Sequence, residues 1–241
     1  MNRGLGKFGL KMKIPRSFRM KKNLDEHIRK LLEDRPKPDY DPLAVKAIID
    51  NGRKFSEEDR NTIFFDQKYL VGTKLANEIS YTKEDLRIAS GNLELKYLDK
   101  YNEVVQNCMT YLQVAEYNLG LYLSALTNKI LAKEEIIVLE PNFLYGCMGA
   151  YVEKGTLIID FDVGNNAGFC MLGGNVIVRG NADDSAGCNM TDGELIIEGC
   201  LGNNTGTSME GGIIRVSGNI KSIASNYKNG IIIQGEEFLR E

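Results

Sequence analysis

Apolar positions in the C-terminal part of the chain recur with a fixed period of 19 residues. Each unit contains one short apolar run, and these runs occupy 156–160, 175–179, 194–198, 213–217 and 231–234. A similar run at 136–140 precedes them. A period near 20 with one β run per unit is typical of a solenoid whose units stack. The pattern therefore predicts a right-handed single-stranded parallel β-helix with about 19 residues per coil.

Glycines and methionines follow the same period. The repeat positions are Gly149, Gly155, Gly168, Gly174, Gly187, Gly193, Gly206, Gly212, Met171, Met190 and Met209. We expect the glycines at corners that need a positive φ or a close approach of two backbones. We expect the methionines to fill the interior of the coil. Asn165, Asp184 and Asn203 share one register and favour turns.

The alternation along each strand separates inner from outer positions. Leu157 and Ile159, with their equivalents in later coils, are expected inside, and the position between them should face outward. That outer row contains Ile158, Ile177, Ile196 and Ile233, with Arg215 at one place. An apolar outer row needs a cover, which the N-terminal half or a partner protein could supply. These isoleucines are therefore a candidate interface.

Residues before the repeat predict helices. Apolar residues spaced by three and four extend over 95–131, with a break or turn at Gly120. A shorter helix is expected over 42–50 and ends at Asn51-Gly52, and another start is expected at Ser56. The fold class is thus α+β. The expected parts are a basic arm with a helix (1–37), a mainly helical domain (38–133) and the β-helix (134–241).

Charge is distributed unevenly along the chain. Residues 1–37 carry a balance of +8 and residues 134–241 a balance of −9, while the whole chain has −3. A basic arm can bind nucleic acid, an acidic partner or the chain's own body. Zinc, helix-turn-helix and aromatic RNA-binding patterns do not accompany the charge, so nucleic acid is not favoured. No run of 18 apolar residues is present, so no membrane-spanning helix is expected.

The residues that could carry chemistry are few. The five cysteines have no CxxC spacing, which predicts reduced thiols and a cytoplasmic protein. Cys147, Cys170, Cys188 and Cys200 occupy four different registers, so we expect no metal or cofactor site in this chain. Candidate acids on the solenoid are Asp183, Asp184 and Asp192, with Arg179 and Arg215 nearby. Turn formation is the simpler role for these aspartates.

Two stretches of the repeat resemble a known family. They are Tyr145-Gly-Cys-Met-Gly-Ala-Tyr-Val-Glu-Lys-Gly-Thr-Leu-Ile-Ile-Asp and Gly168-Phe-Cys-Met-Leu-Gly-Gly-Asn-Val-Ile-Val. They resemble the GXGXG domain, the C-terminal β-helix of the glutamate synthase large subunit. The unit Gly180-Asn-Ala-Asp-Asp-Ser-Ala-Gly-Cys-Asn-Met-Thr-Asp-Gly is similar to the GXGXG-repeat subunit of formylmethanofuran dehydrogenase. The resemblance covers roughly residues 142–235.

This resemblance implies a non-catalytic scaffold subunit of a larger oxidoreductase assembly. It implies that FMN, iron–sulfur or pterin cofactors reside on partner subunits rather than on this chain. Asn2 stands where the amidotransferase domain of glutamate synthase has a nucleophilic cysteine, so that activity is not expected here. The alternatives are a component of a formylmethanofuran dehydrogenase-type complex, an oligomerising adaptor without an enzyme partner, and a carbohydrate-active β-helix enzyme.

Overall fold

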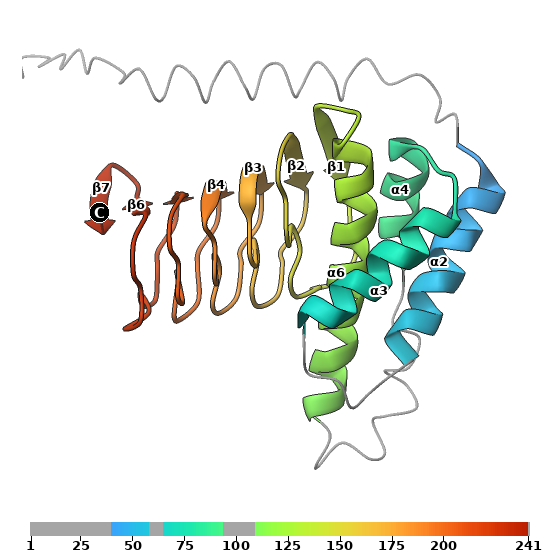
Figure 1. Ribbon diagram of the computed structural model, residues 1–241. Helices are drawn as coiled ribbons and strands as arrows, with labels where there is room; N and C mark the ends of the chain where they lie inside the picture. Colours follow the sequence, from blue (N-terminus) through green and yellow to red (C-terminus); the bar gives the residue numbers. More distant parts are fainter. Residues whose placement is uncertain (1–39, 58–64, 94–108, 241) are drawn as a thin grey trace, which may run out of the picture. The chain divides into compact units, whose positions relative to one another are not determined.

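The computed structural model describes residues 40–57, 65–93 and 109–240, with side chains omitted over 109–115. The chain divides into two units, 1–39 and 40–241, and all described residues belong to the second. The basic arm and the first part of the predicted 95–131 helix therefore lie outside the described residues. The described part contains helices followed by a parallel β-solenoid, which confirms the α+β fold class (Figure 1).

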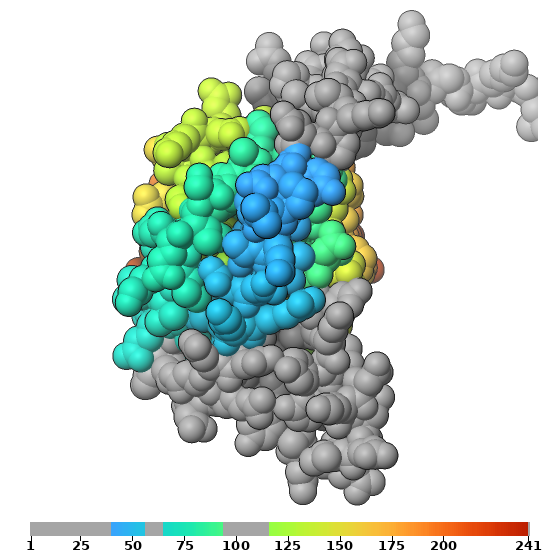
Figure 2. Space-filling model, turned by 90° about the vertical axis from the view of Figure 1, so that its right-hand side faces the viewer, coloured from blue at the N-terminus to red at the C-terminus, as the bar shows by residue number. Residues whose placement is uncertain are grey.

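Four helices precede the solenoid in the described part of the chain. They are α2 (Pro42–Glu57), α3 (Phe65–Glu78), α4 (Lys83–Ser90) and α6 (Met109–Leu131). The helices α2, α3 and α4 all pack against α6, and α2 and α3 form the outer surface at the helical end (Figure 2). A capping box between Thr82 and Asp85 fixes the start of α4, because each side chain bonds a backbone N–H of the other residue.

Two of the predicted helix ends are wrong. The helix α2 continues through Asn51-Gly52 to Glu57, so Ser56 is inside a helix rather than at a start. The helix α6 likewise continues through Gly120. Both glycines serve close packing: a Cβ at Gly52 would lie 2.9 Å from Leu93 Cδ2, and one at Gly120 would overlap the carbonyl oxygen of Gly146.

Seven strands form one sheet whose spatial order equals their order in the chain (Figure 1). The strands are β1 (Ile136–Leu139), β2 (Thr156–Ile159), β3 (Leu172–Val178), β4 (Asp192–Ile197), β5 (Ile213–Val216), β6 (Ile231–Gln234) and β7 (Glu237–Arg240). Neighbours from β1 to β6 pair in parallel, whereas β7 pairs with β6 antiparallel. Thr156 lies beside Asn175 and Asn175 beside Glu194, which is the predicted 19-residue register. The sequence pattern does not predict the final antiparallel strand.

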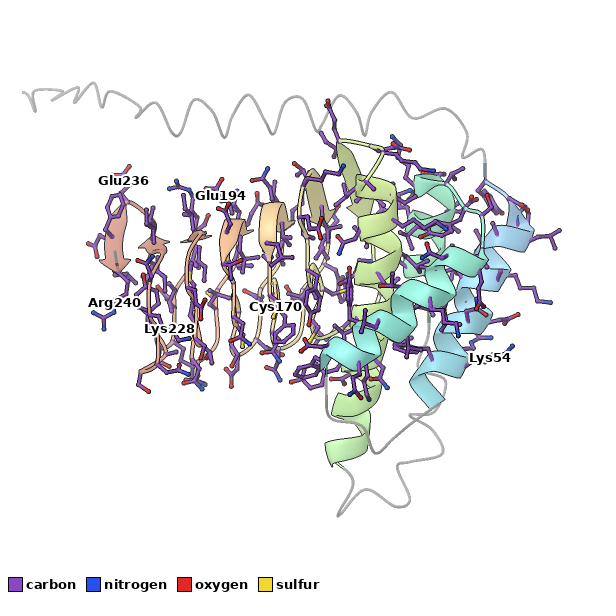
Figure 3. The ribbon with its side chains drawn as sticks, in the orientation of Figure 1. Lys54, Cys170, Glu194, Lys228, Glu236 and Arg240 are labelled. Atoms are coloured by element: carbon purple, nitrogen blue, oxygen red, sulfur yellow. The ribbon has the colours of Figure 1, made fainter. Side chains whose placement is uncertain are left out.

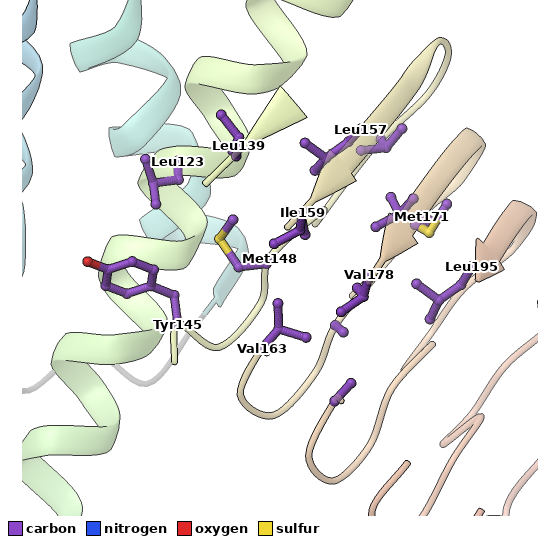
Figure 4. Packing of buried hydrophobic residues seen from close by; sticks show 14 of the residues in the cluster. Leu123, Leu139, Tyr145, Met148, Leu157, Ile159, Val163, Met171, Val178 and Leu195 are labelled. Carbon is purple, nitrogen blue, oxygen red and sulfur yellow. The ribbon is translucent and has the colours of Figure 1, made fainter. Parts of the chain in front are cut away.

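The interior of the solenoid follows the predicted rows. Leu157 and Ile159 are fully buried, as are their partners in the next two coils (Figure 4). Met171, Met190 and Met209 are also fully buried and join the same hydrophobic cluster. That cluster includes Ile48 of α2 and Ile232 of the last coil. The helices and the solenoid therefore share one core.

The predicted corner role of the repeat glycines is also confirmed. All eight have a positive φ, between +63° and +91°. At Gly193, φ is +91° and an added Cβ would lie 2.6 Å from the carbonyl oxygen of Gly173 in the preceding coil. A side chain here would meet both a strained backbone and a backbone clash, so glycine is required.

Candidate functional site

The helix α6 meets the first coil through polar side chains that occur in an otherwise apolar segment. Ser124 Oγ donates to the carbonyl of Cys147 at 3.0 Å and accepts from the amide of Ala150 at 3.2 Å. Asn128 Nδ2 donates to the carbonyls of Ala150 and Tyr151, at 3.0 and 3.1 Å. Ser124 and Asn128 are four residues apart and so lie on one helix face. This face closes the first end of the solenoid.

Asn128 takes the place of a backbone donor from a missing coil. In the coils that follow, the equivalent carbonyls are those of Phe169 and Cys188, which accept from Tyr151 N and Cys170 N of the preceding coil. The carbonyl of Ala150 belongs to the first coil and has no such predecessor. The side-chain amide of Asn128 supplies the donor that a solenoid end otherwise lacks.

Tyr117 and Gly120 bring α6 close to the turn at Gly146. A Cβ at Gly146 would lie 2.6 Å or less from the Tyr117 ring, and Asn165 Nδ2 donates to the Tyr117 hydroxyl at 3.1 Å. The sequence pattern indicates a break at Gly120 and singles out neither Ser124 nor Asn128. The available signal is a stripe of small and polar residues at Gly120, Ser124 and Asn128, spaced by four.

Three of the four solenoid cysteines gather in one cluster. Cys147, Cys170 and Cys188 belong to one apolar cluster with Phe169, although they occupy different registers. The reason is that their registers lie on the same face of adjacent coils, as the hydrogen bond from Cys170 N to Cys188 O at 2.8 Å shows. A difference in register therefore does not keep these three thiols apart.

The environment of these thiols does not activate them. Burial raises the pKa of Cys147 well above its ordinary value, and the neighbouring thiols act in the same direction. Burial and Asp66 raise the pKa of Cys170 to about 11. Burial also raises the pKa of Cys188. A reactive cysteine needs the opposite shift, because the thiolate is the nucleophile.

Aromatic residues of α3 cover this cluster. The Tyr69 ring stacks on that of Tyr151 with centroids 4.2 Å apart, and Phe65 contacts Phe169 edge-on at 5.2 Å. The Tyr151 hydroxyl donates to Asp66 at the start of α3. Figure 3 labels Cys170 on the coil beside this helix. The cluster is thus a packed junction between α3 and the solenoid.

One carboxyl at the α6 junction titrates unusually. Burial raises the pKa of Glu116 to about 7, and the negative charge of Asp183 adds to the effect. Burial also raises the pKa of Asp183, together with the charges of Asp184 and Asp162. Shifted carboxyl pKa values are found at many catalytic sites, and also in structural clusters. The negative charge of the predicted acid Asp183 thus acts on Glu116, a residue that the sequence did not indicate.

The other predicted acids and arginines do not converge with Asp183. Asp184 Oδ1 accepts from the amide of Asn203 at 2.6 Å, and Asp192 Oδ1 accepts from that of Gly193 at 2.7 Å. Arg179 pairs with Asp160 at 3.2 Å, and Arg215 pairs with Glu194. These side chains support turns and neighbouring coils.

The outer row of isoleucines is shielded rather than open. Ile158, Ile177 and Ile233 are at most 5% exposed, Ile196 is half-buried, and Arg215 is exposed. Among the described residues, the helices contact the sheet mainly at β1 and β2, through α4 and α6. The helices thus reach the start of the row, and the candidate interface remains a prediction.

Neither a metal cluster nor a membrane span is found in the described part of the chain. No group of three histidine, cysteine or carboxylate side chains could hold a metal ion there. No described helix has the length and apolar character needed to cross a bilayer. In comparisons with known proteins, no family model, no curated protein and no solved structure matches the chain.

Proposed function

We propose that this chain is a non-catalytic β-solenoid scaffold within a larger enzyme assembly. The likeness of residues 142–235 to the GXGXG domain of glutamate synthase favours an oxidoreductase assembly whose cofactors reside on other subunits. The coil length and the positive-φ glycines agree with that likeness.

The observation that carries this proposal is that polar side chains of the solenoid form hydrogen bonds between its coils. Two ladders of side chains bond the amides of the next coil. One contains Asp162, Asn181 and Cys200, and the other contains Asn165 and Asp184. Each member accepts from a backbone amide one coil further on, so these groups hold the stack together. A rigid stack positions other proteins well, because its surface is fixed by backbone hydrogen bonds.

Two features weigh against the enzyme alternative. A retaining or inverting glycosidase needs a pair of carboxyls flanking a substrate. Asp184 and Asp192 are instead bonded to backbone amides of the turns. The thiols at the α3 junction have raised pKa values, which disfavours nucleophilic chemistry.

The test is a gentle anaerobic purification of the tagged full-length chain from its own cells, followed by native mass spectrometry. We expect the wild type and Asp183→Asn to be recovered with the same flavin-, iron–sulfur- or pterin-bearing subunits. Any activity of that assembly should be equal for both. Gly193→Val, which disrupts a corner, should lose these subunits. Recovery of the chain without other subunits, with an activity that Asp183→Asn removes, would overturn the proposal.

A further inference from the structure

Cys170 and Cys188 lie side by side on adjacent coils. The amide of Cys170 donates to the carbonyl of Cys188 at 2.8 Å, so the two backbones are direct neighbours. Cys188 is one position before Asn189, the residue 19 positions after Cys170. Neighbouring strands are about 4.8 Å apart, and an offset of one residue lengthens the Cα separation to about 6 Å. A disulfide spans Cα separations of about 4.4–6.8 Å, so the backbone of this pair allows one.

The side chains at these two positions project to the same side of the solenoid. Tyr151 and Phe169 occupy the equivalent positions one coil earlier. The amide of Tyr151 donates to the carbonyl of Phe169 at 3.0 Å, and their rings are in edge contact with centroids 5.7 Å apart. Tyr151 and Cys170 share a left-handed backbone, with φ of +57° and +51°. Cys170 and Cys188 both pack against the cluster that contains Phe169, so the two thiols lie on one side, as a disulfide requires.

The third thiol of this cluster, Cys147, is placed differently. Its amide donates to the carbonyl of Asn165 at 2.8 Å, so its neighbour on the next coil lies five residues before Cys170. Cys147 is fully buried, whereas Cys170 and Cys188 are half-buried. Oxidation of a thiol depends on its exposure. Position and access therefore both select the pair Cys170 and Cys188.

The surroundings of the pair favour the disulfide once it has formed. A strongly oxidising disulfide is one whose reduced form is stabilised. Here burial raises the pKa of both thiols, and the charge of Asp66 adds to the effect at Cys170. The reduced pair therefore gains no stabilisation as a thiolate. The same shift makes the thiolate scarce, so the pair should react slowly at neutral pH.

We propose that Cys170 and Cys188 form a disulfide when the protein reacts with a small-molecule disulfide such as oxidised glutathione. One protein thiolate attacks a sulfur of oxidised glutathione, breaks its S–S bond and releases one glutathione. The second protein thiolate attacks the protein sulfur of this mixed disulfide, forms the new S–S bond and releases the second glutathione. The protein pair loses two electrons and two protons, and oxidised glutathione gains them.

The new bond joins two adjacent coils beside α3, on the coil where Figure 3 labels Cys170. It closes a loop from Cys170 to Cys188, which is one coil of the solenoid. A closed loop restricts the unfolded chain, so the bond makes this part of the stack harder to open. The inference depends on this pair alone and is independent of the proposed scaffold function.

Peptide mapping of the full-length chain tests the pair. The parent is Cys200→Ser, because trypsin leaves Cys188 and Cys200 together on 180–215 and places Cys170 on 155–179. The folded chain is reduced, freed of reductant and incubated with oxidised glutathione at mildly alkaline pH, where more thiolate is present. Remaining thiols are blocked with N-ethylmaleimide, and the unreduced peptides are identified by mass spectrometry. We expect a loss of two free thiols per chain and a link between these two peptides.

Matched variants take their residues from the next coil, where Asn189 and Thr207 occupy the same two positions. In the same parent, Cys170→Asn and Cys188→Thr should each abolish the linked peptides. Thermal melting by circular dichroism confirms that each variant is folded.

Three results would overturn the proposal. One is glutathione attached to Cys170 and Cys188 with no link between them. Another is a link from either residue to a different cysteine in place of this one. The last is a link that appears only after urea has unfolded the chain, because the folded stack would then not hold the two thiols together.

Discussion

The two ends of the solenoid are closed by different chemistry. At the first coil, the side chains of Ser124 and Asn128 on α6 bond backbone groups that no earlier coil can reach. At the last coil, the chain turns at Gly235 and adds β7 as an antiparallel strand. The first closure depends on particular side chains at particular distances. The second depends on the backbone, and its side chains lie mostly in solvent.

This difference predicts where the protein tolerates change. A stack of coils leaves unpaired backbone groups and an open core at each end, and both must be covered. Substitutions at the α6 end disturb side chains that fit the end of the solenoid, so they should lower the free energy of unfolding strongly. Substitutions at the β7 end leave the backbone pairing intact, so they should lower it only slightly.

The largest effect is expected for Gly120→Val. The new Cβ would overlap the carbonyl of Gly146, whose backbone cannot move without displacing the first coil. We expect a loss of about 3 kcal/mol or more in the free energy of unfolding, measured by urea denaturation. The matched control is Gly72→Ala on α3, where the nearest atom to a new Cβ is the Tyr122 Cα at 3.4 Å. That variant should change stability by less than about 1 kcal/mol. Equal losses in the two variants would contradict the close-approach role of Gly120.

A coil in the middle should respond to Gly193→Val almost as strongly. Its φ of +91° and the Gly173 carbonyl at 2.6 Å predict a loss of about 2–4 kcal/mol. The control position is Gly235 at the β7 end. Its φ is +60°, and no atom lies within 4 Å of a Cβ added there. Asparagine tolerates that conformation, so Gly235→Asn should cost less than about 1 kcal/mol. An unchanged melting temperature for Gly193→Val would contradict the assignment of Gly193 to a corner that requires glycine.

The same contrast separates what the sequence predicts from what it misses. The inner rows beginning at Leu157 and Ile159, and the corner at Gly193, could be predicted because each recurs in several coils. Because several coils share the same pattern, an exception at one position does not hide it, and the period of the pattern corresponds to the length of one coil. The strand β7 occurs once, outside the repeat, and no periodic signal marks it.

The candidate site could be predicted only in part, since it involves contacts between repeating and non-repeating segments. Gly120 interrupts a helical pattern in the sequence, yet its role depends on where Gly146 lies. Cys170 and Cys188 are in different registers, yet adjacent coils bring them together. The negative charge of Asp183 acts on Glu116, which belongs to the non-repeating helix α6. Tertiary packing of this kind leaves no local periodic pattern.

An intermediate effect is expected for Asn128→Ala. The variant removes the side-chain amide that donates to the carbonyls of Ala150 and Tyr151. Among the described residues, no earlier coil exists whose backbone amide could replace this donor. We expect a loss of about 1–3 kcal/mol in the free energy of unfolding. Asn128→Asp keeps the shape but replaces the donor with an acceptor, so it should cost more at neutral pH. Hydrogen exchange at the first coil would locate the change. If Asn128→Ala leaves that exchange unaltered, Asn128 is not the cap of this end.

The smallest effect concerns Glu116, and it depends on pH. Burial and Asp183 raise the pKa of this carboxyl from its ordinary value near 4.5 to about 7. Between these values the folded protein retains a proton that the unfolded chain has released, so stability falls as pH rises from about 4.5 to about 7. Glu116 is half-exposed and solvent screens it, so we expect Glu116→Gln to add only about 1 kcal/mol at pH 8 and little at pH 4. Urea denaturation at both pH values measures this difference, with the exposed Glu153→Gln as the control. An equal gain at both pH values would show that the proton on Glu116 does not govern the junction between α6 and the solenoid.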